Sequence, residues 1–197
     1  MIDSLGPSIS IVSPANGGTY ILNAAVASSY SCSDGTSGVG TCSGPVASGM
    51  NFSTNPVGAH VFTVNGSDVA GNSAQATNNY SVIYNFTGFF QPVDNLPTLN
   101  IVKAGSGIPV KFSLSGDQGL SIFEMDYPAS SAITCGGTAV DAIEQTVTAG
   151  SSSLSYDAST DTYTYVWKTD KSWAGSCRTL VVKLNDGTLH RANFQFK

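Results

Sequence analysis

The spacing of turn-forming residues constrains the fold of this chain more than any other feature. Gly, Ser, Asn and Pro interrupt the sequence at intervals of about eight to twelve residues, as in all-β proteins. Between the interruptions apolar and polar residues alternate, so that His60, Phe62 and Val64 fall on one face of residues 58–65. A period of two residues is that of a β-strand. The sequence therefore predicts an all-β fold.

The alternating segments also predict individual strands and hairpins. Tyr156 and Tyr163 flank one expected turn, and Asn185-Asp186-Gly187 forms another because its glycine can adopt a positive φ. Pro109 lacks a backbone N–H, so we expect it at a sheet edge or a strand start. The expected strands are residues 8–12, 20–27, 58–65, 74–84, 108–114, 180–184 and 192–196, with either a short helix or a strand at residues 140–147.

The charge distribution argues against several partners. The formal net charge is -5, and no Lys or Arg occurs before Lys103. Binding to nucleic acid or to an anionic membrane surface depends on such basic residues. No stretch has the roughly 18 consecutive apolar residues of a membrane-spanning helix. We therefore expect no nucleic-acid partner and no membrane insertion. As a separate expectation, the chain is a segment of a longer exported protein.

The four cysteines predict two disulfides. Cys32 and Cys42 bracket a short Gly/Ser loop, whereas Cys135 and Cys177 lie in the second half of the chain. Zinc sites favour closely spaced cysteine pairs or histidines at ligand spacing, which this sequence lacks. We therefore expect the pairs Cys32–Cys42 and Cys135–Cys177, and with them an oxidising, extracellular or cell-surface location.

Residues 6–84 resemble a known class of domain. The resemblance rests on the segments SCSDGTSGVGTCSG, VGAHVFTVNGSDVAGN and NNYSVIY. The most specific part is D-x-A-G-N, which follows an alternating strand. These segments are similar to the bacterial immunoglobulin-like domains that occur in tandem on exported proteins. The resemblance implies an immunoglobulin-like β-sandwich and no particular activity.

Residues 86–197 resemble a second family along their full length. The family is the PxKF domain, whose motif is present here as Pro109-Val110-Lys111-Phe112. The resemblance implies a module from the C-terminal part of secreted bacterial proteins, with no catalytic residues to carry over. We therefore expect two tandem immunoglobulin-like or related antiparallel β-sandwiches, at residues 6–84 and 85–197, joined by a stiff apolar segment.

Catalytic residues are not evident in this sequence. The two histidines, His60 and His190, lie in different predicted domains and outside any nucleophile or metalloprotease motif. The two glutamates, Glu124 and Glu144, do not form an evident acid/base pair in a cleft. The sequence predicts that the protein is not an enzyme.

Calcium is the one cofactor that the residue pattern raises. Asp34 precedes a Gly/Ser loop, and Asp68 and Asn72 share a turn, so oxygen-rich loops at one end of a sandwich are available as ligands. The alternative is purely local, because Asp and Asn in turns also bond to backbone groups two residues further on. Both readings remain open at this stage.

Aromatic residues offer a second candidate binding feature. Tyr163, Tyr165 and Trp167 share one face of a predicted strand, and the opposite face is more polar, so the aromatic face is expected to point inward. Trp173 follows in a loop beside Gly175. It is the candidate glycan contact if it is exposed, and otherwise it is expected to close the end of the core.

These features predict a non-catalytic accessory, stalk or adhesion module of a secreted or surface-displayed bacterial protein. The expected partners are flanking domains of a larger protein, a cell-surface polymer or neighbouring subunits. Two alternatives remain: a carbohydrate-binding or polymer-binding module, and a subunit of an extracellular fibre that assembles through edge-strand pairing.

Overall fold

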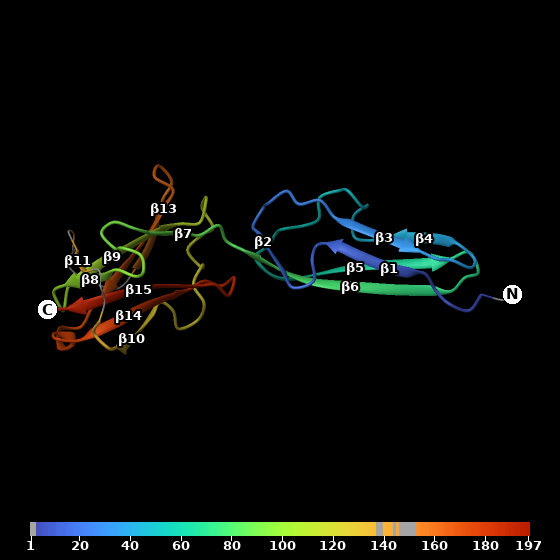
Figure 1. Cartoon of the computed structure of the whole chain (residues 1–197). Helices are drawn as coiled ribbons and strands as arrows, with labels where there is room; N and C mark the ends of the chain where they lie inside the picture. The colour runs from blue at the N-terminus through green and yellow to red at the C-terminus, as the bar shows by residue number, and fades with distance from the viewer. Residues whose placement is uncertain (1–2, 137–139, 144, 146–152) are drawn as a thin grey trace. The chain divides into compact units, whose positions relative to one another are not determined.

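The computed structural model describes residues 3–136, 140–143, 145 and 153–197, and the regular secondary structure of these residues is almost entirely β-strand (Figure 1). The chain divides into two units, Met1–Ile83 and Tyr84–Lys197. This division falls one residue before the predicted boundary. No helix among the described residues is long and apolar enough to cross a membrane.

The first unit contains two sheets. Strands β2, β6, β5 and β4 form one sheet in that order, and β1 pairs with β3 in the other. The disulfide Cys32–Cys42 joins β3 to β4, with the pairing that the sequence predicts. The strands are β1 (Ser8–Ser13), β2 (Gly18–Ile21), β3 (Ser29–Ser33), β4 (Val39–Ser43), β5 (Gly58–Asp68) and β6 (Ser73–Ile83).

The β5–β6 hairpin carries most of the core of the first unit. Phe62 and Val64 alternate inward from β5 as predicted, and Tyr80 and Val82 do so from β6. The predicted strand at residues 20–27 is too long, because β2 ends at Ile21 and the chain turns at Asn23, whose φ is 62°. The pairing of β2 with β6 is parallel, so this sheet is not purely antiparallel.

The second unit also contains two sheets. One has the order β12-β13-β9-β7 and the other the order β10-β14-β15-β8-β11, in which β8 pairs in parallel with both of its neighbours. The disulfide Cys135–Cys177 has the predicted pairing. The elements are β7 (Thr87–Phe90), β8 (Leu99–Val102), β9 (Gly107–Ser113), β10 (Ala129–Ile133), β11 (Val140–Ala142), β12 (Ser153–Asp157), β13 (Thr162–Lys168), the 3-10 helix η1 (Lys171–Trp173), β14 (Cys177–Lys183) and β15 (Leu189–Phe196).

The predicted hairpins of the second unit are present. Tyr156 pairs with Tyr163, and β14 and β15 are joined through Asn185-Asp186-Gly187. Pro109 lies inside a sheet but beyond the reach of β7, which pairs with β9 only between Ser113 and Lys111. Of the segment predicted as helix or strand, residues 140–142 form β11, whereas residues 144, 146 and 147 lie outside the described residues.

The core of the second unit lies between its two sheets. Tyr163 and Trp167 are buried and Tyr165 is half-buried, so the aromatic face of β13 points inward as the alternation predicts. Phe112 stacks on Tyr163 with ring centroids 5.5 Å apart. Phe194 contacts Trp167 edge-on from the facing sheet at 5.0 Å.

Candidate functional site

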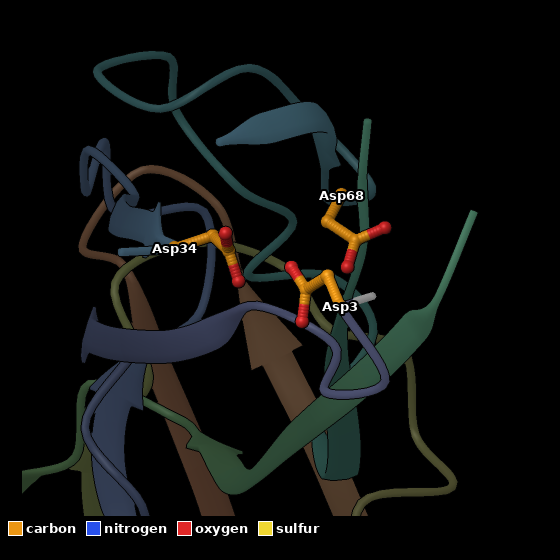
Figure 2. Close-up of side chains that lie close together, drawn as sticks. All are labelled: Asp3, Asp34 and Asp68. Carbon is orange, nitrogen blue, oxygen red and sulfur yellow. The ribbon is translucent and has the colours of Figure 1, made fainter. Parts of the chain in front are cut away.

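The carboxylates of Asp3, Asp34 and Asp68 converge at one end of the first unit. Their ligand atoms all lie within 4.8 Å of one another, and Figure 2 shows the three side chains turned toward a common space. Asp3 lies in the N-terminal segment, Asp34 follows β3, and Asp68 ends β5. We call these three residues the carboxylate cluster. Strand ends and loops thus bring together side chains that are far apart in the sequence.

The loop after β3 is folded around the Asp34 side chain. Its Oδ1 atom accepts hydrogen bonds from the backbone N–H groups of Thr36, Ser37 and Gly38 over 3.1, 2.9 and 2.8 Å. Gly38 has a φ of 84°, which glycine adopts without strain. The short Gly/Ser sequence therefore wraps around the carboxylate and fixes its position.

Asn72 holds Asp68 in the turn between β5 and β6. The Asn72 backbone N–H donates to Oδ1 of Asp68 and its Nδ2 group donates to Oδ2, both over 2.7 Å. Burial opposes ionisation of Asp68, but hydrogen bonds, chiefly those from Asn72, outweigh it and keep the pKa of Asp68 below its usual value. Asp68 is therefore held as an anion although it is only 4% exposed.

Asn72 also anchors the N-terminal segment. Its Nδ2 group lies 3.3 Å from the backbone oxygen of Asp3 and 3.5 Å from that of Leu5. The sequence predicted Asn72 as a calcium ligand, but its amide nitrogen faces the cluster and donates to Asp68. Asn72 therefore positions a carboxylate rather than offering its own oxygen.

Ser37 lies between the acidic side chains. Its backbone N–H donates to Oδ2 of Asp3 over 3.1 Å as well as to Asp34. Its hydroxyl is near enough to Asp68 to help lower the pKa of that group. Yet the buried Oγ atom makes no well-formed hydrogen bond within the part of the chain that the structure describes. A further oxygen therefore lies beside the carboxylates.

The first unit supplies no basic side chain to balance this cluster. Its sequence contains no Lys or Arg, and Asp3, Asp34 and Asp68 are its only acidic residues. Every carboxylate side chain of the unit is therefore gathered at one place, where mutual repulsion opposes folding. Backbone N–H donors offset part of this repulsion, and a bound cation would offset more.

Oxygen ligands at loop ends suit a hard cation such as calcium, which takes six to eight of them. The structure brings together Asp34 and Asp68, as the calcium reading requires, and adds Asp3. Sequence reasoning missed Asp3 because it belongs to no motif and lies far from the other two along the chain. The signal available was the scarcity of acids: only three occur in residues 1–83.

Trp173, the candidate glycan contact, lies in η1 at the end of the second unit. Its ring contacts the rings of Trp167 and Phe196, with centroids 5.8 and 5.5 Å apart. The Arg178 guanidinium lies over the ring, 4.2 Å from its centroid. Arg178 therefore occupies a face of the ring on which a sugar would otherwise stack.

The histidines lie in separate units. His60 stacks on Tyr80 with centroids 5.1 Å apart, and its Nε2 atom lies 2.6 Å from the backbone oxygen of Pro56. His190 stacks on Phe86 in the second unit with centroids 3.5 Å apart. Each ring is thus engaged in local packing.

No protein-family model matches the chain, and no curated protein matches it. Among solved structures it is similar to fibronectin(III)-like modules of Clostridium thermocellum CbhA, with 14% identity, 96% of this chain and 94% of that chain covered, and a TM-score of 0.34. It is also similar to the tandem Ig repeats of Dlar, with 8% identity, 98% and 99% coverage and a TM-score of 0.24.

A third solved structure is the Bacteroides ovatus mixed-linkage glucan utilization locus SGBP-B in complex with a mixed-linkage heptasaccharide. The identity is 14%, the TM-score is 0.25, and the match covers 98% of this chain but only 48% of that one. The fold class rests on the sheets described above: the chain is all-β, with a β-sandwich in each of its two units.

Proposed function

We propose that this chain is a non-catalytic accessory, stalk or adhesion module of a secreted or surface-displayed bacterial protein, with a PxKF domain as its second unit. The observation that carries the proposal is that each unit has its own core and its own disulfide. Disulfides persist in oxidising compartments, and small sandwiches crosslinked in this way stay folded there. Such units can hold another domain away from a surface or present loops to a partner.

Secretion and substrate tests address this proposal directly. Peptide mapping without reduction of the secreted chain should recover both disulfides and no free thiol. The same preparation should turn over none of a panel of ester, glycoside, peptide and phosphate substrates. Turnover that is abolished by replacing His60 or His190 would overturn the proposal.

The carboxylate cluster supports a more specific role for the first unit, in which calcium stabilises its end. The favouring observation is that all three carboxylate side chains of a unit without Lys or Arg meet within 4.8 Å, beside the buried Ser37 hydroxyl. Asp3, Asp34 and Asp68 would be the carboxylate ligands. A bound ion would tie the N-terminal segment to the loop after β3 and to the end of β5.

The two units can be observed separately in this test. Both tryptophans, Trp167 and Trp173, lie in the second unit, so tryptophan fluorescence reports its unfolding alone, whereas circular dichroism reports both units. Calcium at about 100 times its Kd stabilises a folded state by about 2.7 kcal/mol. For a unit of this size that corresponds to a rise in Tm of roughly 10–20 °C. The rise should occur only for the first unit, whose unfolding changes the circular dichroism but not the tryptophan fluorescence.

The matched variants are Asp34→Asn and Asp157→Asn. Asparagine at position 34 keeps an oxygen for the loop N–H groups but removes the charge, so the calcium response should be lost. Asp157 accepts hydrogen bonds from Ser159 in a turn of the second unit, and Asp157→Asn should leave the response intact. An unchanged Tm of the first unit in calcium relative to EDTA, or an equal response in Asp34→Asn, would contradict this role.

A further inference from the structure

The second unit carries a shallow groove on the outer face of its β12-β13-β9-β7 sheet, with a volume of about 430 Å³. Thr162 and Thr164 of β13 line it, and they alternate with the inward-facing Tyr163. Lys111 of β9 also lines it and lies next to the buried Phe112. The groove is therefore built from the solvent-facing side chains of a sheet whose other face forms the core.

Strand register places the lining side chains next to one another. Phe90 pairs with Lys111, and Lys111 pairs with Thr164, so an aromatic ring, an ammonium group and a hydroxyl group form a row across three strands. Thr162 pairs with Asp157 on the next strand, which adds a carboxylate at the far side. Side chains at paired positions share one face of a sheet. The row therefore spans the sheet rather than following one strand.

Phe90 is the aromatic residue that lines this groove. The neighbouring Phe89 is buried and 5% exposed, whereas Phe90 remains half-buried and lines the groove. Consecutive residues of a strand face opposite sides of the sheet, so one of these two rings must point outward. The extra residue of β7 between Thr87 and Phe90 decides which one, because it places Phe90, and not Phe89, opposite Lys111. One aromatic side chain of an apolar segment is thereby left accessible beside polar groups.

The chemistry of the lining defines the ligand class. Thr hydroxyl groups both donate and accept hydrogen bonds, Lys111 donates, and Asp157 accepts. No hydrogen bond or ion pair of Lys111 is found among the residues that the structure describes, so its ammonium is available to a ligand. One positive and one negative side chain leave the groove without net charge. A ligand that matches it carries many hydroxyl groups, no charge and an apolar ring face.

We propose that this groove binds a neutral glycan chain, with one sugar ring against Phe90 and its hydroxyl groups bonded to Lys111, Asp157 and the threonines. This inference rests on the proposed function and deepens it, because it names the partner class of an adhesion module. The contact lies at Phe90 and not at Trp173, whose ring carries Arg178 over one face.

Other ligand classes fit the groove less well. An extended peptide that joins a sheet pairs with the main chain of an edge strand, whereas this groove lies on a face and offers side chains. An anionic polymer requires a surplus of basic groups, but Asp157 balances Lys111 and the whole chain has a net charge of -5. These classes therefore serve as the alternative outcomes of the test.

Affinity gel electrophoresis of the full chain tests the proposal. The probes are a soluble β-glucan, a xylan, a mannan and a galactan, with polygalacturonate and a reduced, carboxymethylated protein as the acidic and peptide alternatives. We expect retardation by at least one neutral polysaccharide. Thr164→Arg places a long side chain in the groove without touching the core and should weaken that retention about tenfold or more, equivalent to about 1.4 kcal/mol.

Two further variants separate binding from folding. Phe90→Ala should weaken retention, and Phe90→Trp should restore it, because the larger ring still offers a stacking face. Ser131→Arg adds the same side chain as Thr164→Arg at an exposed position of β10 on the other sheet and should leave retention unchanged. The tryptophan fluorescence transition of each variant checks that the second unit remains folded.

Each outcome decides the question. Loss of retention in folded Thr164→Arg, with retention kept in Ser131→Arg, supports the groove. Retention by none of the neutral polysaccharides, retention only by polygalacturonate or the peptide, or equal retention in Thr164→Arg overturns the proposal. None of these results alters disulfide content or substrate turnover, so failure of the groove is distinguishable from failure of the accessory function.

Discussion

The guanidinium carbon of Arg178 lies 4.2 Å from the centroid of the Trp173 ring, and the same ring contacts Trp167 and Phe196. Arg178 is held in place by hydrogen bonds to Ser130 on β10, from Nε over 3.2 Å and from a terminal nitrogen over 3.1 Å. The tryptophan is thus enclosed by a cation on one side and by core aromatic rings. This arrangement closes one end of the second unit.

Trp173→Ala is accordingly expected to destabilise the second unit by about 3 kcal/mol, the lower end for removal of a large aromatic side chain, because the ring is only partly buried. Urea unfolding followed by the fluorescence of Trp167 measures the loss. Arg178→Met is the milder comparison, since an exposed cation–π contact contributes about 0.5–1 kcal/mol. A variant Trp173→Ala that keeps full stability but loses glycan retention would place the glycan contact at Trp173 instead.

The two disulfides are expected to stabilise their own units independently. Cys32 and Cys42 are separated by 10 residues, and Cys135 and Cys177 by 42. In the chain-entropy model these loops correspond to about 3 and about 4 kcal/mol. Replacing Cys135 and Cys177 together by serine should lower the fluorescence-detected transition of the second unit. Replacing Cys32 and Cys42 should lower only the transition of the first unit, which circular dichroism detects without a change in tryptophan fluorescence. A shift of both transitions by either pair would contradict independent units.

Local sequence patterns predicted much of the fold because strand faces and hairpins are local properties. The alternation of His60, Phe62 and Val64 and the pairing of Tyr156 with Tyr163 depend only on period two and on turn residues. Parallel pairings could not be predicted in this way. The pairing of β2 with β6 joins segments about 60 residues apart, and no short pattern specifies such a partner.

The candidate sites show the same limit. Asp34 and Asp68 could be singled out because each lies in a turn-like segment, but Asp3 joins them only through the tertiary fold. Phe89 and Phe90 are a second example, because alternation predicts that the two rings face opposite sides of the sheet but not which one is buried. The register shift in β7 decides the outcome, so that Phe89 is buried and Phe90 lines the groove.

Asp161 is expected to be the most sensitive acidic residue of the second unit. Its Oδ2 accepts from the Ser113 hydroxyl over 2.7 Å, and its Oδ1 accepts from the Tyr156 hydroxyl and the Gly116 N–H, each over 2.9 Å. The hydrogen bond from Ser113 makes the largest contribution to lowering the pKa of Asp161. Its φ of 49° also lies in the left-handed region, which Asp and Asn tolerate better than Ala.

Asp161→Ala should therefore destabilise the second unit more than Asp161→Asn, and Asp157→Asn should have the smallest effect. Asp161→Ala removes both hydrogen-bond acceptors and introduces a residue that tolerates a positive φ poorly. Asp161→Asn removes only part of the acceptor capacity, and Asp157→Asn changes a carboxylate whose hydrogen bonds lie within its own turn. Urea midpoints from tryptophan fluorescence give the ranking. Equal midpoints for the two Asp161 variants would show that the hydrogen bonds, and not the backbone conformation, account for the loss.

The stability of the second unit should also depend on pH through His190. Burial lowers the pKa of His190 below its ordinary value of 6.5, and this outweighs the opposing effect of Asp186. The folded state therefore favours the neutral ring, which stacks on Phe86 with Nε2 lying 3.0 Å from the Thr188 hydroxyl. As pH falls below 6.5, the unfolded chain binds a proton at His190 before the folded chain does. The contribution of His190 to the free energy of unfolding is therefore fully present above pH 6.5 and is lost as pH falls toward the lower pKa of the folded state.

Urea unfolding at pH 7.5 and pH 5.0, followed by tryptophan fluorescence, should show this loss in the wild-type chain. His190→Gln should be less stable at pH 7.5, because the stacked ring is gone, but its stability should change less between the two pH values. His60→Gln, in the first unit, should leave the fluorescence-detected pH dependence unchanged. The aspartates with lowered pKa, such as Asp161, release their stabilisation only as pH falls below about 3.8, so they do not contribute in this window. A pH dependence that persists in full in His190→Gln would assign the effect to another group.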